Sequence, residues 1–159
     1  MALAENFPNN NYIGVDIKGN RIWVGAKEAL EKKQANVCFL RTQIEYLTHF
    51  FAPQEVQEIW ITFADPQLGK PKKRLTSPRF LDIYRKILSP NHIMHLKTDS
   101  PELYESTLEV IAEQKLNILY QNEDIYAAPL DFPELEYKTF YEKMHLENGK
   151  SIKYLRWTL

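Results

Sequence analysis

The chain has 159 residues, 44% of them hydrophobic and 26% charged, which suits one folded domain with a sizeable core and excludes a disordered or collagen-like chain. Its apolar runs are too short to span a bilayer, and its N-terminus lacks the basic and apolar regions of a signal peptide. The single cysteine cannot form an internal disulfide. We therefore expect a cytoplasmic protein with one domain over residues 1–159 and no membrane partner. No residue pattern specifies an oligomeric state.

Short apolar segments alternate with segments of helical spacing along most of the chain. The apolar segments predict strands at 12–16, 37–40, 59–63 and 93–96. Helices are expected over the apolar positions of 44–51 and after the capping residues Asn20, Ser77 and Ser100. A proline follows Ser77 and Ser100 at the first helical position, which strengthens both predictions. This alternation predicts an α/β fold with a mostly parallel sheet.

The end of the chain departs from the regular spacing. Strands are predicted at 116–120 and 152–157, the second of them after the turn signal Asn148–Gly149. We expect these two strands to pair antiparallel at one edge of the sheet. Residues 121–136 are acidic and contain prolines, which predicts a loop.

Three aspartates follow predicted strands. Asp16, Asp65 and Asp99 come after the first, third and fourth strands, and ligands of open parallel sheets bind beyond the carboxyl ends of the strands. A single aspartate at such a position is more often a turn or helix cap. Three of them at one sheet edge favour a binding site.

The charge of the chain is unevenly distributed. Residues 66–86 contain seven lysines and arginines and one acid, a net charge of +6 in a chain whose total is −1. One concentrated basic segment on an acidic protein indicates a local contact with a polyanion, and a solvated surface of a loop and helix is the alternative.

Other site chemistries fit less well. Gly14 and Gly19 have the spacing of a phosphate loop, but Asn20–Arg21 follows where such a loop needs Lys-Ser/Thr. Cys38 lies within an apolar strand, which predicts a buried structural thiol. The four histidines are scattered, so we expect no metal site.

Five short motifs occur in one order along nearly the whole chain. They are Gly-Val-Asp at 14–16, Phe-Ala-Asp-Pro at 63–66, Lys-Lys-Arg-Leu-Thr at 72–76, Lys-Thr-Asp at 97–99 and Thr-x-x-Glu at 139–142. In order and spacing they resemble the tRNA (guanine-N7)-methyltransferases of the bacterial TrmB type. The resemblance implies a Rossmann-like class I fold that uses S-adenosylmethionine to methylate guanine N7 in the variable loop of tRNA.

The resemblance also implies roles for individual residues. The cofactor contacts are Asp16, Gln43 and Asp65, and Asp65 is also the catalytic residue. The substrate contacts are Lys70, Asp99, Thr139 and Glu142, with Gly69 as the alternative to Lys70. The RNA contacts are Lys72, Lys73 and Arg74.

The chain departs from the family pattern in three places. Gln43 stands where the family usually has aspartate, and Gln67 where it has tryptophan. The N-terminal residues resemble the end of the helix that follows the family's first strand, so we expect that strand and its glycine-rich cofactor loop to be absent. A non-catalytic RNA-binding module, or an inactive fragment of such an enzyme, is therefore the alternative function. A nucleotide-dependent oxidoreductase shares Asp16 but does not predict the basic segment.

Overall fold

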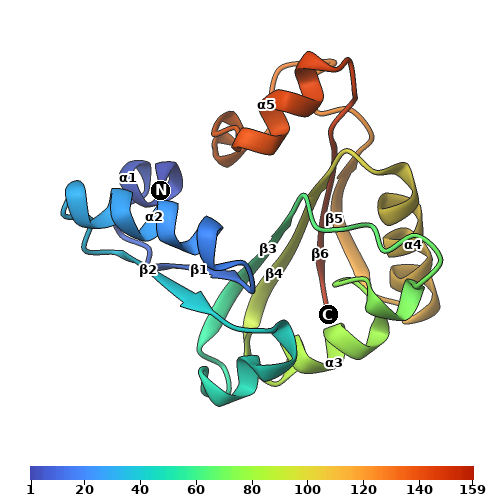
Figure 1. Cartoon of the computed structure of the whole chain (residues 1–159). Helices are drawn as coiled ribbons and strands as arrows, with labels where there is room; N and C mark the ends of the chain where they lie inside the picture. The colour runs from blue at the N-terminus through green and yellow to red at the C-terminus, as the bar shows by residue number, and fades with distance from the viewer. The chain divides into compact units, whose positions relative to one another are not determined.

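The computed structural model describes residues 1–159 and divides them into two compact units, Met1–Leu47 and Thr48–Leu159, each of which we describe by itself (Figure 1). None of the helices is long and apolar enough to cross a membrane.

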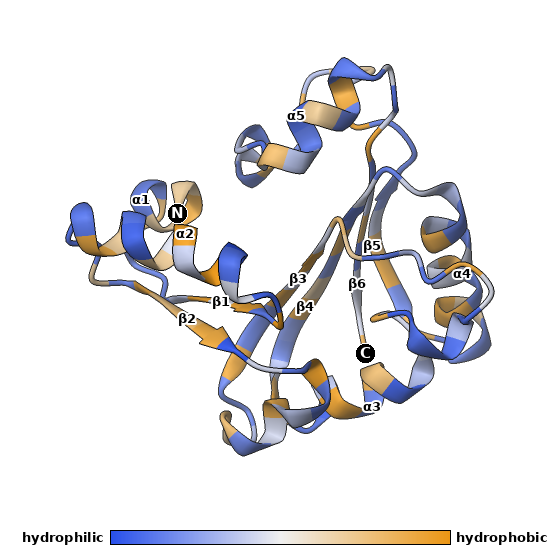
Figure 2. Ribbon diagram, in the orientation of Figure 1, coloured by the Kyte–Doolittle hydropathy of each residue, from blue (hydrophilic) through white to orange (hydrophobic).

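The first unit is a two-stranded parallel sheet with helices. Its elements are α1 (Ala2–Asn6), β1 (Tyr12–Asp16), α2 (Gly19–Glu31) and β2 (Val37–Arg41), and the 3₁₀ helix η1 (Ile44–His49) leads out of it. The two strands, largely apolar in Figure 2, pair with Gly14 opposite Phe39. A Cβ at Gly14 or Gly25 would come within 2.7 or 2.5 Å of the Phe39 ring, so both glycines allow β1 and α2 to approach that ring.

Two local predictions for this unit were wrong, and a third was right only in part. Asn20 does not cap α2, because Lys18 holds the N-cap position and the Asp16 carboxylate accepts from the Lys18 N–H at 2.8 Å. The expected helix over 44–51 is the 3₁₀ helix η1. The Cys38 thiol is exposed, and its strand neighbour Ile13 is also 45% exposed.

The second unit contains a four-stranded sheet in the order β3-β4-β6-β5. Its strands are β3 (Val56–Thr62), β4 (Leu88–Thr98), β5 (Asn117–Asn122) and β6 (Lys153–Thr158). β3 and β4 are parallel, and β6 is antiparallel to both β4 and β5, which confirms the antiparallel edge.

Three α-helices and two 3₁₀ helices complete this unit. They are η2 (Pro71–Lys73), α3 (Pro78–Arg85), α4 (Pro101–Glu113), η3 (Pro133–Glu136) and α5 (Phe140–Glu147). Ser100 caps α4 as predicted, with its hydroxyl accepting from the Leu103 N–H at 3.2 Å. Ser77 holds the N-cap position of α3, but its hydroxyl donates to the Lys72 carbonyl at 3.2 Å, so the predicted capping hydrogen bond was wrong. The predicted loop 121–136 contains η3.

Side chains pack on both faces of the four-stranded sheet. Helix α4 packs on β4 and β6, where Leu96, Leu155 and Trp157 are completely buried. A second buried cluster joins Tyr154 of β6 to residues of the segment 125–135 and to Ile152. The loops that leave the strands therefore start from a sheet that is packed on both faces.

A buried histidine lies within the sheet of this unit. His95 of β4 stacks on Trp60 with ring centroids 3.8 Å apart, and its Nδ1 lies 2.8 Å from the Tyr154 hydroxyl. Burial lowers the pKa of His95, although Glu58, whose carboxylate lies 3.2 Å from Nε2, opposes that shift. Folding therefore favours the neutral imidazole.

We expect this histidine to make stability fall in mild acid. Below pH 6.5 the unfolded state binds a proton that folded His95 resists, so the free energy of unfolding falls with decreasing pH by up to about 1.4 kcal/mol per unit until the folded pKa is reached. Urea unfolding at about pH 7 and about pH 5.5 measures this decrease. His95→Gln should reduce it and His49→Gln, at an exposed site, should not; equal decreases in both variants would contradict the assignment.

Candidate active site

The loops after β3 and β4 leave the same edge of the sheet. The two strands are parallel, with Thr62 opposite Lys97 at their ends, so Asp65 and Asp99 follow neighbouring strand ends. This juxtaposition confirms the expectation for these two aspartates. The expectation that all three aspartates share one sheet edge was wrong for Asp16, because it is the last residue of β1 and belongs to the separate two-stranded sheet of the first unit.

The loop after β3 has a constrained backbone. Phe63, Gln67 and Gly69 have positive φ angles of 48°, 49° and 72°. The Asp65 Oδ1 accepts from the Gln67 N–H at 2.8 Å, which forms a tight turn around the following proline. The Asp65 carboxylate is itself exposed and available to a ligand.

The predicted RNA contacts fall into two groups. Lys70, Lys72 and Lys73 are exposed on the loop and on η2. Arg74 is only partly exposed, and its Nε donates to the Pro66 carbonyl at 2.8 Å, which closes the loop on itself. The three lysines can therefore reach a polyanion, whereas Arg74 holds the loop that carries them.

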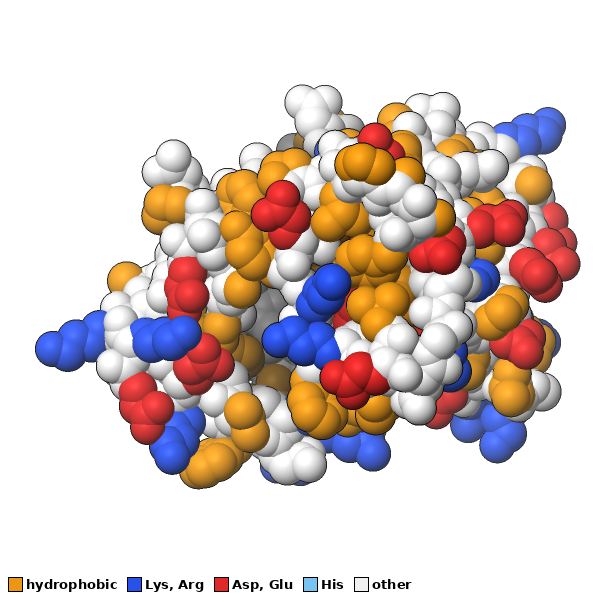
Figure 3. Space-filling model, turned by 90° about the horizontal axis from the view of Figure 1, so that it is seen from above, with side chains coloured by type: hydrophobic (Ala, Val, Ile, Leu, Met, Phe, Trp, Pro, Cys, Tyr) orange, Lys and Arg blue, Asp and Glu red, His pale blue; other side chains and the backbone are white.

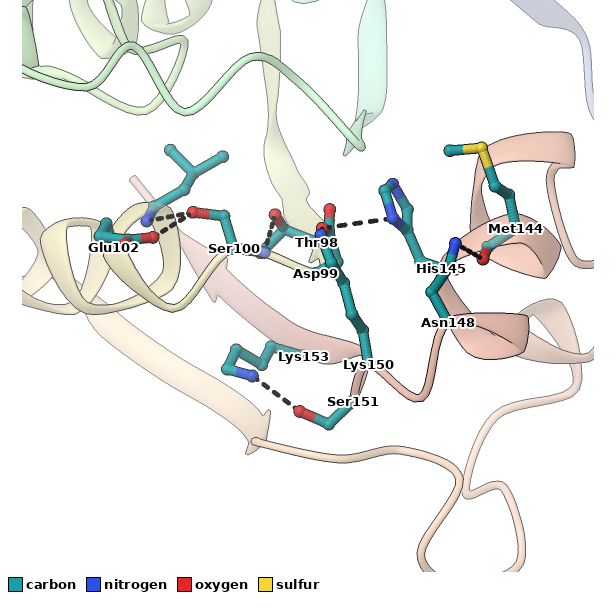
Figure 4. Close-up of polar contacts among 11 residues, drawn as sticks. Thr98, Asp99, Ser100, Glu102, Met144, His145, Asn148, Lys150, Ser151 and Lys153 are labelled. Carbon is teal, nitrogen blue, oxygen red and sulfur yellow. Dashed lines mark hydrogen bonds and ion pairs between the residues drawn. The ribbon is translucent and has the colours of Figure 1, made fainter.

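The side chains of a lysine and a histidine contact the carboxylate of Asp99. Its side chain is 16% exposed, and its Oδ2 lies 2.6 Å from Lys150 Nζ and 3.4 Å from His145 Nδ1 (Figure 4). The His145 ring also stacks on Phe63 at a centroid distance of 5.7 Å. His145 of α5 and Lys150, which follows this helix, thus both contact the residue that follows β4.

A buried ion pair attaches α5 to β4. Glu142 is completely buried, and its Oε1 lies 2.6 Å from the Nζ of Lys97, which is 4% exposed. The Tyr126 hydroxyl donates to the same oxygen at 2.6 Å, and the Thr139 N–H donates to Oε2 at 3.1 Å. Burial lowers the pKa of Lys97, and the Glu142 carboxylate opposes this shift.

Thr139 and Glu142 also form the N-terminal capping box of α5. The Thr139 hydroxyl accepts from the Glu142 N–H at 3.1 Å, while the Glu142 carboxylate accepts from the Thr139 N–H. With both carboxylate oxygens bound inside the protein, Glu142 holds α5 in place and thereby positions His145 beside Asp99.

The remaining predicted site residues lie in the first unit. Asp16 is the last residue of β1, and Gln43 follows the carboxyl end of the parallel strand β2. Asp16 Oδ1 accepts from the Lys18 N–H, and Oδ2 lies 3.4 Å from Arg21, with the side chain 28% exposed. Gln43 is exposed. Both side chains keep acceptor capacity for a ligand.

The sequence alone indicated no role for His145 or Lys150, and it marked Phe63 only as part of the Phe-Ala-Asp-Pro motif. The Asn148–Gly149 turn signal was the only hint near Lys150, and nothing local marks a lysine as the partner of an aspartate 51 residues away. An open hollow also joins these segments. It is lined by Pro66, Leu68, Asp99, Ser100, Pro101, Glu102, Lys150, Ser151 and Lys153.

The polar character of this region is mixed. Figure 3, seen from the top of Figure 1, shows basic and acidic side chains close together with exposed apolar side chains among them. Phe140 of α5 and Leu68 of the loop are 77% and 67% exposed. No group of three or more His, Cys, Asp or Glu side chains is placed to hold a metal ion.

Comparisons with known proteins identify the family of the chain. A family model described as "Putative methyltransferase" matches residues 1–155. A tRNA (guanine-N(7)-)-methyltransferase of Bacteroides thetaiotaomicron is 46% identical over the whole chain, which spans 63% of that relative's length. The enzyme of the same description from Christiangramia forsetii is 48% identical, with the whole chain covering 72% of it.

Solved structures give the same fold at low sequence identity. The 16S rRNA methyltransferase KamB superposes with a TM-score of 0.72 at 14% identity, over 99% of this chain and 80% of that one. An antibiotic-related methyltransferase superposes with a TM-score of 0.66 at 17% identity, over 98% of this chain and 78% of that one.

We predict that Glu142→Gln destabilises the protein by about 3–5 kcal/mol, because it leaves the Lys97 ammonium buried without a counter-charge. Lys97→Met in the same chain should recover part of the loss by removing that charge. Urea unfolding measures both variants, and Glu147→Gln at an exposed position of α5 is the control. A loss below about 1 kcal/mol for Glu142→Gln would show that the pair does not hold α5.

Proposed function

The chain belongs to the tRNA (guanine-N7)-methyltransferase family, and from this premise we propose that it acts in the transfer of a methyl group from S-adenosylmethionine to guanine N7 in the variable loop of tRNA. It has the Rossmann-like fold of methyltransferases. The observation that supports the proposed reaction most is the pair Asp65 and Asp99 at neighbouring strand ends, beside a loop with exposed lysines. A tRNA substrate implies the cytoplasm as the place of action.

The residues of the first unit fit S-adenosylmethionine. When bound, the cofactor supplies an electrophilic methyl group on a positively charged sulfur. The Asp16 carboxylate, with lone pairs left beside Lys18 and Arg21, suits the hydroxyl pair of its ribose. The exposed Gln43 amide suits the amino group of its adenine.

Guanine N7 needs little chemical help from the protein. Its lone pair is free, so no general base has to remove a proton, but methylation leaves a positive charge on the purine. The exposed carboxylate of Asp65, fixed by the turn to Gln67, stabilises that developing charge. The backbone strain of the loop thus serves to hold a carboxylate at one place.

Asp99 is proposed to recognise the base. Guanine presents N1–H and N2–H₂ on one edge, and a carboxylate can accept from both. Asp99 is mostly buried, and a base that lacks these donors could not replace the contacts that its carboxylate makes in the free protein. In a folded RNA the guanine has to leave its stack to reach this carboxylate.

The remaining residues of the predicted set have supporting roles. Lys70, Lys72 and Lys73 bind phosphates, and Arg74 holds their loop through Pro66. Thr139 and Glu142 position α5 through the capping box and the buried pair with Lys97.

A non-catalytic RNA-binding module is the second candidate, because the chain spans only 63% of the length of its Bacteroides relatives. The two functions differ in one measurement. Incubation of the chain with tRNA and methyl-labelled S-adenosylmethionine should yield 7-methylguanine in the variable loop. Binding of tRNA without any transfer would instead support the module.

Asp99→Asn is expected to lower methyl transfer about 100-fold or more, because the amide replaces one acceptor of the base-reading carboxylate by a donor. The affinity for S-adenosylmethionine, measured by calorimetry, should not change. Asp82→Asn, which removes an exposed charge on α3, is the matched control. A normal transfer rate in the Asp99 variant would leave Asp99 as a structural residue before α4.

The double variant Lys72→Gln, Lys73→Gln should lower the slope of log K against log salt for tRNA binding by roughly 1.4–1.8, since two fewer counterions are released. Binding should weaken to a similar extent for different tRNAs, because phosphate contacts carry little sequence information. Lys115→Gln, after the far end of α4, should leave the slope unchanged. An unchanged slope in a folded double variant would place the RNA contact elsewhere.

A further inference from the structure

The carboxylate that is proposed to read guanine is already occupied in the free protein. Lys150 Nζ lies 2.6 Å and His145 Nδ1 lies 3.4 Å from the same oxygen of Asp99 (Figure 4). Both groups approach where the N–H groups of a base edge would have to donate. The Lys150 ammonium therefore has to leave the Asp99 carboxylate before a base can make all of its hydrogen bonds to that carboxylate.

The backbone of Lys150 is fixed, whereas its side chain is not. The Lys150 N–H donates to the His145 carbonyl at 3.0 Å, and the Gly149 N–H donates to the Leu146 carbonyl at 2.9 Å. With Gly149 at φ 71°, these bonds form a Schellman motif at the C-terminus of α5. The Lys150 side chain is 50% exposed, so it can swing about this fixed backbone.

The surroundings of Lys150 suit an RNA backbone. The hollow beside Asp99 also contains Lys153, and the loop that forms another wall, through Pro66 and Leu68, continues into exposed Lys70. An ion pair with a half-exposed lysine is weak and is screened by salt, so a phosphate can compete with Asp99 for it. The Lys97–Glu142 pair, by contrast, is inaccessible to such competition because both side chains are buried.

We propose that Lys150 exchanges partners when RNA binds: it neutralises Asp99 in the free protein and moves to a phosphate in the complex, which frees the carboxylate for the guanine edge. This inference rests on the proposed function. It makes the recognition of the base depend on prior contact with the RNA backbone, and it makes Lys150 a positioning residue that acts through Asp99.

The test is a set of tRNA-binding measurements at several salt concentrations with the full chain. Lys150→Gln should weaken binding several-fold and lower the slope of log K against log salt by about 0.7–0.9, the effect of one phosphate contact. Lys150→Arg keeps the charge and should keep the slope. Lys115→Gln removes the same charge at the opposite end of α4 from the hollow and should leave the slope unchanged.

A double-variant cycle isolates the exchange itself. Asp99→Asn removes the contact with the base in every chain, but where Lys150 is present it also spares the lysine from leaving a carboxylate. The substitution should therefore be less harmful to tRNA binding, by about three-fold or more, in the chain with Lys150 than in the Lys150→Gln chain.

An absence of tRNA binding would overturn the proposal. Two further results would also overturn it. One is a wild-type slope in folded Lys150→Gln, and the other is an equal effect of Asp99→Asn with and without Lys150. Methyl transfer tests the proposed function separately. If the chain transfers the methyl group and its Lys150→Gln variant keeps the wild-type slope, the exchange of partners by Lys150 is contradicted and the proposed function is not.

Discussion

The buried ion pair between Lys97 and Glu142 is the interaction on which the arrangement of the second unit's site depends. Lys97 lies two residues before Asp99 at the end of β4, and Glu142 lies three residues before His145 on α5. Such a pair is costly to bury, but removing one partner costs about 3–5 kcal/mol because the other charge is then uncompensated. It therefore holds the helix and the strand end in one arrangement.

Two ion pairs of different character lie at the end of β4. The Lys97–Glu142 pair is buried and is reinforced by Tyr126 and by the capping box. The Lys150–Asp99 pair has the same length of 2.6 Å, but its lysine is half exposed. The first pair fixes α5 against β4, whereas in the second pair the lysine can change its partner. The two pairs differ in role despite their equal lengths because solvent reaches only the second one.

Much of the fold could be predicted because its signals are local. Short apolar runs identified every strand, and Ser100–Pro101 identified the start of α4 with its hydrogen bond. Predictions failed where a neighbour distant in sequence decides the outcome. The Ser77 hydroxyl binds the Lys72 carbonyl instead of its own helix, and Cys38 is exposed although its segment is apolar.

The candidate site could be predicted only in part for the same reason. The aspartates follow strands, and parallel pairing brings Asp65 and Asp99 to one edge, which the order of elements already implies. Glu142 and Lys150 meet their partners on β4 and after it across 45 and 51 residues, and no local pattern encodes those contacts.

The central claim is that guanine is recognised by its N1–H and N2–H₂ edge and methylated at N7. A tRNA whose target guanosine is replaced by 7-deazaguanosine tests it directly, because this analogue keeps the edge and lacks the N7 lone pair. The account predicts that the protein binds this tRNA as tightly as the unmodified one and transfers no methyl group from labelled S-adenosylmethionine. Transfer of a methyl group to any other atom of the 7-deazaguanine base, or a large loss of affinity for this tRNA, would contradict the claim.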